Sequence, residues 1–286
     1  MITRATAMNS TPANPTSSGG STTHAPLGLH VAGVLWRREM VRFARQPARI
    51  AAAIGTPIIV WALMGSGFAE AYRPAIEVGG ESGAVTTSYG SFLLPGMMTL
   101  VALFTAIFSC ISIIEDRQEG WLQSVLVSPA PRWSIAAGKI LGGSTLAFVQ
   151  AALLLAVWPW LGAWPGAGPL MLVLAALLLV SVGMTGVGVA FAWRSASTQG
   201  FHAVMNLVLM PMWLLSGAFF PPQSAAPWLE AVMWINPLTW GTIAVRHALL
   251  GGDFEVWPLA GSALFAGLAF GMATAVVAHR GKGILA

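Results

Sequence analysis

Charged side chains are scarce in this sequence, and their scarcity excludes an ordinary water-soluble domain. Only 8% of the 286 residues are Asp, Glu, Lys or Arg, whereas 56% are hydrophobic, and the mean hydropathy is +0.73. Soluble domains carry about 25% charged residues, because their surface faces water. The chain is therefore predicted to lie mainly within a lipid bilayer.

Cysteine is nearly absent as well, since Cys110 is the single one. One thiol excludes an internal disulfide framework, a metal site built from several cysteines and a CxxC redox pair. The sequence also lacks a Walker A loop, an HExxH zinc motif and a GxSxG nucleophile motif. We therefore expect no catalytic residue, no metal and no cofactor bound by this chain.

The first 26 residues contain no apolar core of the kind that a secretory signal peptide needs. They are rich in Ser, Thr, Pro, Gly and Asn, a composition that buries too little apolar surface to offset the entropy of ordering. Residues 1–26 are therefore predicted to form a disordered cytoplasmic tail.

Long apolar segments recur along the rest of the chain. A membrane-spanning helix needs about 20 residues without charge. Six segments satisfy this rule, at about 50–68, 92–114, 140–162, 170–192, 201–220 and 257–278. A further stretch, 231–245, is too short to cross and is broken at Asn236-Pro237. The predicted fold is an all-α integral membrane protein of six transmembrane helices, with a re-entrant or interfacial outer segment of two short helices between spans five and six.

Lys and Arg residues are distributed unevenly around these spans. With six spans both chain ends lie on one side, which then carries 12 of the 14 Lys and Arg residues, and only Arg73 and Arg246 lie opposite. Because Lys and Arg accumulate in cytoplasmic loops, both termini are predicted to be cytoplasmic. The isoelectric point near 10 is thus explained by membrane orientation and anionic lipid rather than by nucleic acid.

A basic amphipathic helix is predicted before the first span. Helical spacing places an apolar set on one face, namely Leu29, Ala32, Trp36, Met40 and Phe43. It places a basic set on the other face, namely Arg38, Arg42, Arg45 and Arg49. The apolar face is expected to enter the membrane interface while the basic face meets lipid phosphates or a protein partner. A simple topogenic anchor is the alternative.

The loop between spans two and three reads EDRQEGWLQSVLVSPAPRW. Glu115, Asp116 and Glu119 are predicted to begin a short helix, whose dipole favours negative charge there. An apolar patch follows, made of Trp121, Leu122, Val125 and Leu126. Such a helix suits docking of a cytoplasmic partner, and an ordinary capped helix on the bilayer is the alternative.

Polar side chains within the predicted spans are few. Gln199, His202 and Asn206 share one helical face, which is expected to turn towards other helices or a cavity, because unpaired amides are costly in lipid. No Asp, Glu, Lys or Arg lies within any predicted span. This absence disfavours an intramembrane hydrolase and an ion-coupled carrier. If the protein moves a cargo against its gradient, the energy must then come from another subunit.

Two ordered motifs carry a resemblance to a known family. The first is Glu115-Asp116-Arg117-Gln118-Glu119-Gly120, followed before span three by Leu122, Val125, Leu126, Ser128-Pro129 and Gly138-Lys139. The second comprises Ser216-Gly217, Phe220-Pro221, Pro227-Trp228 and Asn236-Pro237-Leu238 through Arg246. With the amphipathic helix and six spans, this arrangement resembles the membrane subunit of ABC transporters of the type-2 exporter class, over about residues 29–280.

The resemblance implies a permease in the plasma membrane (the inner membrane of a bacterium) that pairs with a separate ATPase holding MgATP and with a second permease subunit, an identical chain being expected. It implies that residues 27–286 form the transmembrane domain. The implied ATPase-coupling loop contains Glu115, Asp116, Arg117, Glu119, Gly120, Leu122 and Leu126. The N-terminal helix would add a contact through Trp36, Arg38, Arg42 and Arg45. The implied translocation path contains Phe104, Phe108, Asn206 and Met210.

The expected cargo is amphipathic or hydrophobic, such as a drug, a lipid or a glycan precursor, since the predicted spans are apolar and rich in aromatic residues. Two other classes of function stay open. A self-contained secondary transporter would work without an ATPase, and a membrane assembly factor would move no cargo.

Overall fold

The computed structural model of the chain describes residues 25–70, 75–77, 84–127, 130–251 and 255–280. Most of the predicted tail at residues 1–26 lies outside these residues. So do Arg4, Arg73 and Lys282, on which part of the predicted charge distribution depends. The described part is mainly helical, with one short pair of antiparallel strands between the helix that ends at Gly67 and the helix that begins at Tyr89.

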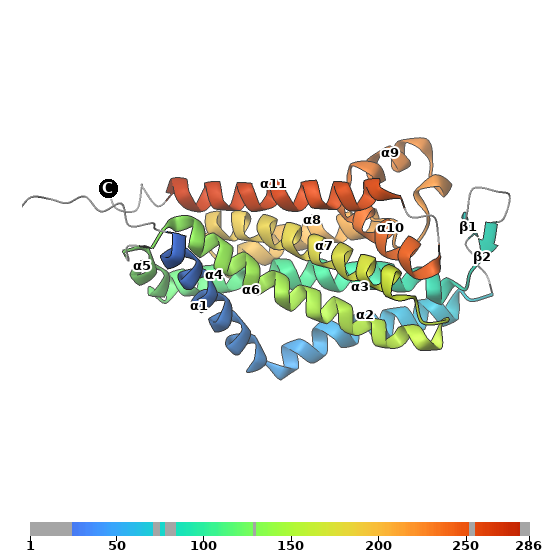
Figure 1. Cartoon of the computed structure of the whole chain (residues 1–286), viewed down its shortest axis with the longest axis horizontal. Helices are drawn as coiled ribbons and strands as arrows, with labels where there is room; N and C mark the ends of the chain where they lie inside the picture. Colours follow the sequence, from blue (N-terminus) through green and yellow to red (C-terminus); the bar gives the residue numbers. More distant parts are fainter. Residues whose placement is uncertain (1–24, 71–74, 78–83, 128–129, 252–254, 281–286) are drawn as a thin grey trace, which may run out of the picture.

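The elements form an elongated bundle. In chain order they are α1 (Ala25–Ala44), α2 (Pro47–Gly67), β1 (Ala75–Glu77), β2 (Ala84–Thr86), α3 (Tyr89–Ser109), α4 (Ile111–Gln118), α5 (Trp121–Leu126), α6 (Arg132–Leu153), η1 (Leu154–Trp160), α7 (Ala167–Arg194), α8 (Thr198–Leu214), η2 (Pro222–Ser224), α9 (Pro227–Ile235), α10 (Pro237–Leu250) and α11 (Val256–Arg280). Figure 1 shows α3, α6, α7 and α11 running along the long axis, with α5 at one end and α9 and the strands at the other. We call these the α5 end and the α9 end.

Four helical segments of the described chain are long and apolar enough to cross a bilayer. They are Tyr89–Gln118, Arg132–Trp160, Ala167–Arg194 and Val256–His279. They match the predicted spans at 92–114, 140–162, 170–192 and 257–278. The predicted spans at 50–68 and 201–220 correspond to α2, with a described apolar part of Ala53–Gly67, and to the 17-residue α8. Four of the six predicted spans are therefore matched by length and composition.

Helix α3 forms the centre of the bundle. Nearly all of its side chains are buried, including Phe92, Met97 and Leu103, and it packs against α2, α6, α7 and α10. Its first turn is capped by Ser88, whose side chain accepts a hydrogen bond from the amide of Ser91. A helix that is buried on all sides reads as continuously apolar, which explains why the hydropathy pattern located it well.

Helix α6 begins at Arg132, about two turns before the predicted start of the third span at residue 140. The prediction was wrong because it required a segment without charge, which excluded Lys139. In the structure Lys139 lies inside α6 and is only 4% exposed. A buried lysine requires a partner, and this partner defines the site described below.

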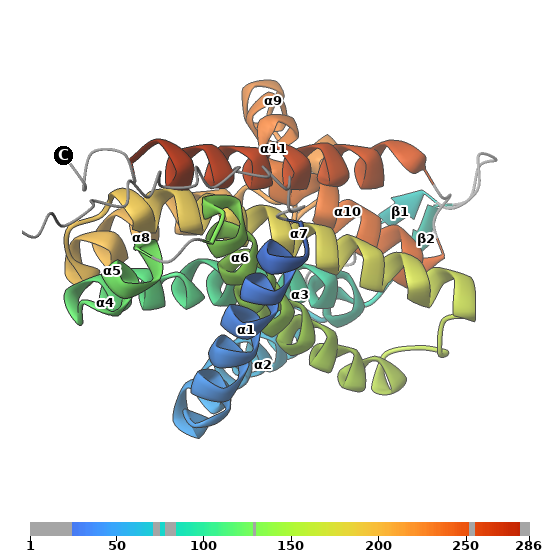
Figure 2. The same ribbon diagram turned by 60° about the vertical axis from the view of Figure 1, so that its left-hand side comes forward.

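The apolar stretch at 231–245 does form two helices, α9 and α10, as predicted. They meet at Asn236, whose side chain accepts a hydrogen bond from the amide of Leu238 and so caps α10. The Asn236 amide nitrogen also donates to the Met212 carbonyl oxygen at 2.5 Å. This hydrogen bond attaches the connection between α9 and α10 to α8. Figure 2 shows α9 projecting from the rest of the bundle.

Candidate functional site

The segment between α3 and α6 forms two helices, α4 and α5, rather than the single short helix that was predicted to begin at Glu115, Asp116 and Glu119. Helix α4 continues from α3 through Cys110, and Gly120 then separates α4 from α5. Gly120 has a φ of +74°, a left-handed backbone conformation that glycine adopts at no steric cost. Glu115 and Asp116 therefore lie in the last turn of α4. The prediction that they begin a helix and are stabilised by its dipole was wrong.

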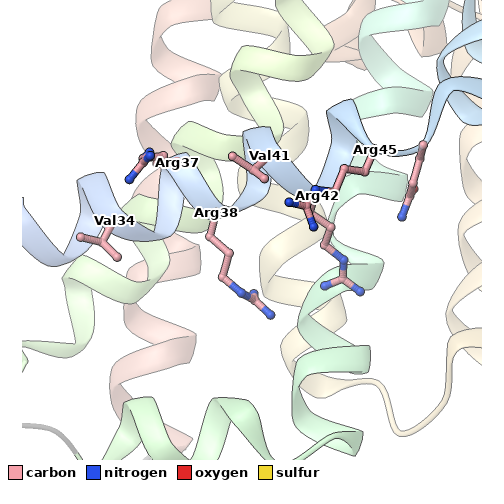
Figure 3. A pocket seen from close by; sticks show the side chains of 7 residues that line it. Val34, Arg37, Arg38, Val41, Arg42 and Arg45 are labelled. Atoms are coloured by element: carbon pink, nitrogen blue, oxygen red, sulfur yellow. The ribbon is translucent and has the colours of Figure 1, made fainter.

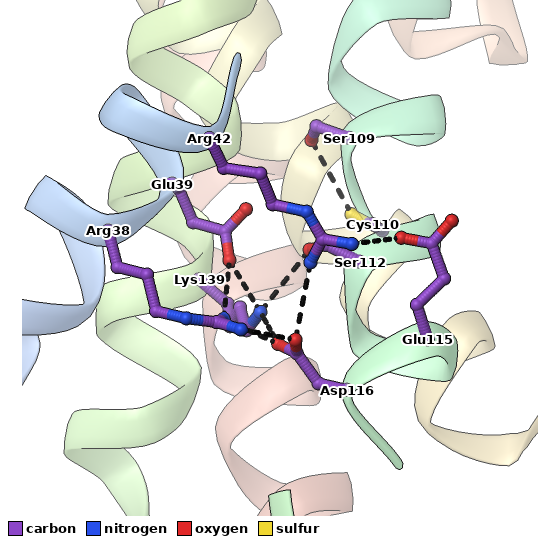
Figure 4. A network of polar contacts seen from close by, with 9 residues as sticks. All are labelled: Arg38, Glu39, Arg42, Ser109, Cys110, Ser112, Glu115, Asp116 and Lys139. Atoms are coloured by element: carbon purple, nitrogen blue, oxygen red, sulfur yellow. Dashed lines mark hydrogen bonds and ion pairs between the residues drawn. The ribbon is translucent and has the colours of Figure 1, made fainter. Parts of the chain in front are cut away.

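Cations stabilise Asp116 instead. Its carboxylate is fully buried and accepts two hydrogen bonds from the guanidinium of Arg38, at 2.7 and 2.9 Å. It also accepts one from Arg42 at 3.2 Å and one from the ammonium group of Lys139 at 2.5 Å. Figure 4 shows these groups converging from α1, α4 and α6. Asp116 thus joins three helices.

Further carboxylates complete this group. Lys139 also donates to Glu39 at 2.6 Å and to the hydroxyl of Ser112 at 3.2 Å, and Arg42 pairs with Glu115. We call the charged members the junction cluster: Arg38, Glu39, Arg42, Glu115, Asp116 and Lys139. It contains three cations and three anions, so its formal charge is zero. Buried charges persist only when they are paired in this way.

The junction cluster adds residues that the sequence prediction missed. Asp116 and Lys139 lie within two of the helical segments that are long and apolar enough to cross a bilayer, just outside the predicted charge-free spans at 92–114 and 140–162. Glu39 and Lys139 were absent from the predicted site. A signal for Glu39 existed, because it is the one acidic residue in an otherwise basic helix. The hydrogen bond from Arg38 to Asp116 raises the pKa of Arg38 above its ordinary value, so this guanidinium stays charged.

Helix α1 packs on α6 along the edge of its predicted apolar face that contains Ala32. Ala32, Leu35 and Glu39 are buried along this edge, whereas Leu29 and Trp36 are exposed. The apolar and basic sets do lie on opposite flanks, but Arg38 and Arg42 turn inwards to Asp116. Arg45 is exposed, and Arg49 lies where no side chain is described. Trp36 donates to the hydroxyl of Thr145 on α6.

The close approach of α1 and α6 depends on Gly138. A Cβ atom at this position would lie 2.7 Å from Cβ of Leu35 and 2.9 Å from the carbonyl oxygen of Ala32. Both distances are shorter than carbon and oxygen atoms tolerate. Gly138 therefore sets how near α1 comes to Lys139, the next residue of α6.

Arg117 belongs to the predicted coupling loop but is directed into the protein. Its guanidinium donates to the carbonyl oxygens of Trp193 and Ser195, at 2.7 and 2.9 Å, where α7 ends. Carbonyl groups at a helix end have no partner within the helix, so a cation there is favourable. Arg117 thereby fixes α4 to the end of α7.

The surface of α5 differs from the predicted apolar patch. Leu122 is buried, Trp121, Val125 and Leu126 are partly buried, and the guanidinium of Arg38 lies 3.8 Å from the centre of the Trp121 ring. Within residues 118–127 the exposed side chains are Gln118, Glu119, Gln123, Ser124 and Val127. Ser128 and Pro129, which complete the first motif, lie outside the described residues. The α5 surface is therefore polar, with Val127 as an exposed apolar residue next to it.

The predicted path residues lie on α3 and α8. The rings of Phe104 and Phe108 have centres 5.6 Å apart, and the Phe108 ring lies 4.9 Å from that of His202. Asn206 and Met210 are exposed on α8. Helix α8 buries only one stripe, formed by Phe201, Met205, Leu209 and Trp213. Gln199, His202 and Asn206 are all exposed, and Phe108 covers only the His202 ring, so the described part of the chain leaves most of this face without a neighbour.

The second motif converges at the α9 end. Arg246 of α10 donates to the carbonyl oxygen of Gly217 at 2.6 Å, and its guanidinium lies 3.8 Å from the centre of the Phe92 ring. Arg246 is buried. It therefore fastens the turn after α8 to the first turns of α3, and its role in this structure is to hold these segments together.

The described residues contain no group of three or more His, Cys, Asp and Glu side chains placed to hold a metal ion. The carboxylates of the junction cluster are all engaged by Arg or Lys. The site is thus a set of ion pairs that holds α1, α4 and α6 together.

Comparison with known proteins indicates the family of this chain. The family described as "ABC-2 type transporter" matches residues 31–250. The "Probable multidrug ABC transporter permease YbhR" of Escherichia coli is 27% identical over 178 residues, which are 60% of this chain and 48% of YbhR. The chain thus spans about half the length of that relative.

Other relatives align over more of their length. "Nodulation protein J" of Neorhizobium galegae is 24% identical over 242 residues, 81% of this chain and 86% of the relative. The "Daunorubicin resistance ABC transporter permease protein DrrB1" of Streptomyces coeruleorubidus is 23% identical over 248 residues, 86% and 80% of the two chains. Because the family match covers well over half of the sequence and both motifs up to Arg246, the chain belongs to the ABC-2 type transporter family.

Proposed function

We propose that the chain is the transmembrane subunit of an ATP-driven ABC exporter. It provides the path for an amphipathic or hydrophobic cargo, and a separate ATPase subunit that binds MgATP supplies the energy. Membership of the ABC-2 type transporter family supports this proposal, and so do the relatives that are named as ABC transporter permeases.

The observation that carries the proposal is the attachment of α5 to the bundle. A short helix at the end of the molecule can transmit a push only if it is held rigidly. Leu122 is buried beneath α5, Arg38 covers Trp121, and Asp116 just before Gly120 is fixed to both α1 and α6. In our proposal the ATPase contacts the exposed residues Glu119, Gln123, Ser124 and Val127, and the junction cluster passes the movement to α1, α4 and α6.

The proposed topology places six helices across the membrane, with α2 and α8 added to the four long segments. Helix α8 has 17 residues, which is at the lower limit of about 17–25 residues for a spanning helix. Both termini and the α5 end would be cytoplasmic, in the plasma membrane or the inner membrane of a bacterium. The excess of Lys and Arg on that side supports this orientation. Helices α9 and α10 would form the outer re-entrant segment.

A second permease subunit is part of the proposal, and the exposed face of α8 supports it. Gln199 and Asn206 make no side-chain hydrogen bond with any other described residue, and Leu207, next to Asn206, is 77% exposed. Unpaired amides facing lipid cost several kcal/mol each. We therefore place a second copy of the chain against α8. The cargo path would run between the two copies, past Phe104, Phe108, Asn206 and Met210.

The first test is purification of the chain from its native membrane through an affinity tag. The proposal expects an ABC ATPase to co-purify, and amphipathic compounds to change the ATP turnover of the complex. A chain that carries no ATPase after mild extraction, and that transports cargo along an ion gradient, would be a self-contained carrier. The buried ion pairs of Asp116 and Lys139 are the feature that would favour this second function.

A further inference from the structure

The outward face of α1 contains an open groove that the proposed coupling route does not use. Its volume is about 660 Å³. It is lined by Val34, Arg37, Arg38, Val41, Arg42, Arg45 and Gln46. Figure 3 shows these arginine side chains arranged around Val34 and Val41 along the helix. None of the described residues that line the groove carries a carboxylate, so the groove is strongly basic.

Its arginines fall into two pairs. Arg38 and Arg42 direct nitrogen atoms to Asp116 and Glu115, and about 30% of each side chain stays exposed, at 31% and 28%. Arg37 and Arg45 are exposed and form no ion pair with the described residues. Because the junction cluster is already neutral, the charges of Arg37 and Arg45 are uncompensated within the described part of the chain.

Exposed apolar side chains lie among these cations. Val34 is 56% exposed and Val41 is 44% exposed. Water solvates guanidinium groups well but exposed valines poorly. A ligand with an anionic group next to a hydrocarbon surface would satisfy both kinds of side chain.

The position of the groove also indicates hydrocarbon. The groove ends at Gln46, directly before Pro47, where α2 begins. Helix α2 exposes further apolar side chains, including Ile59 and Leu63. A molecule whose head lies in the groove can therefore extend its apolar part along α2.

We propose that this groove binds the phosphate headgroup of an anionic phospholipid. The guanidinium groups of Arg37 and Arg45 contact the phosphate oxygens, and Arg38 and Arg42 contribute their exposed edges. The acyl chains lie against Val34, Val41 and the exposed side of α2. A lipid bound in this way holds α1 at the membrane surface, independently of the contacts of α5.

The test uses the purified full chain in detergent, incubated with equal amounts of phosphatidylglycerol and phosphatidylcholine and examined by native mass spectrometry. The wild-type chain should retain phosphatidylglycerol in preference. In the double variant Arg37→Gln/Arg45→Gln this preference should fall by about tenfold, because each basic residue near an anionic headgroup contributes favourably. The charge-preserving variant Arg37→Lys/Arg45→Lys should keep most of it. Arg194→Gln, which removes an exposed arginine at the end of α7, should leave it unchanged.

Three results would overturn the proposal. One is equal retention of the two lipids by the wild-type chain, and another is an unchanged preference in the double Gln variant. The third is displacement of the lipid by millimolar inorganic phosphate alone, because the groove would then be a site for a free anion. Loss of ATPase co-purification in the double Gln variant, with lipid preference intact, would assign the groove to the ATPase instead. None of these results decides the proposed exporter function, which is tested by co-purification of an ATPase with the wild-type chain.

Discussion

The ammonium nitrogen of Lys139 lies 2.5 Å from a carboxylate oxygen of Asp116, and this contact joins the helices on the two sides of the α5 segment. Asp116 precedes Gly120 and α5, whereas Lys139 lies on α6, the next long helix. Arg38 and Glu39 extend the contact to α1. A displacement of α5 must therefore strain ion pairs on α1, α4 and α6 together.

Removal of the Asp116 charge tests this joint. Asp116→Asn keeps the shape of the side chain but leaves Lys139 and Arg38 without their shared anion. Breaking a buried ion pair on one side costs about 3–5 kcal/mol, so the unfolding temperature of the purified chain should fall markedly. Glu119→Gln removes an exposed carboxylate three residues away and should have little effect on the unfolding temperature. Equal stability of the two variants would mean that the junction cluster is not a structural joint.

Gly138 tests whether the spacing of α1 and α6 matters. In Gly138→Ala the new methyl group meets Leu35 and Ala32, so α1 must move away from Lys139. We expect a loss of about 1–3 kcal/mol in stability, typical of overpacked sites. Gly33→Ala is the matched control, because nothing lies within 4 Å of a Cβ atom there. Thermal unfolding measures both variants, and an unchanged Gly138→Ala protein would contradict the described packing.

The α5 region allows docking to be separated from folding. Val127 is 71% exposed, so Val127→Asp should leave the unfolding temperature unchanged but reduce the amount of ATPase that co-purifies. Leu122 is buried, and Leu122→Ala should lower the stability by about 2–5 kcal/mol. If Val127→Asp retains a full complement of ATPase with normal turnover, the partner docks elsewhere.

The exposed face of α8 predicts a cross-link between two copies. Cys110 is buried, so oxidation is expected to link the cysteines introduced on the surface and to leave Cys110 unreacted. Leu207→Cys should form a disulfide-linked dimer when membranes are oxidised. Leu264→Cys, on a similarly exposed part of α11, should remain monomeric. A gel without reducing agent distinguishes them, and cross-linking through Leu264→Cys alone would place the interface on α11.

Hydropathy predicted much of the fold because lipid imposes one strong rule on a long helix. It located α3, α7 and α11 to within a few residues, and the Asn236-Pro237 pair located the break between α9 and α10. The same rule misplaced the start of α6, because Lys139 is paired and thus tolerated inside the helix. A spanning helix must be free of charge where its side chains face lipid, but not where they face another helix.

The sequence motif drew attention to Glu115 and Asp116, but it did not predict the contacts that these residues make. Spacing along the chain gave no information on which cations meet Asp116, since Arg38 and Lys139 come from segments far apart in sequence. The glycine at position 120 could be read as either part of a helix or its end, and only the backbone conformation decides. Leu122 was expected on the surface for the same reason, because the direction of α5 depends on that turn.

The most direct test of the proposed function is reconstitution into lipid vesicles, with transport of a fluorescent amphipathic compound as the readout. The purified chain alone should be inactive under any ion gradient. The chain together with its co-purified ATPase and MgATP should transport the compound, and Val127→Asp should abolish this transport while still inserting. Transport by the chain alone, without ATPase or ATP, would contradict the account.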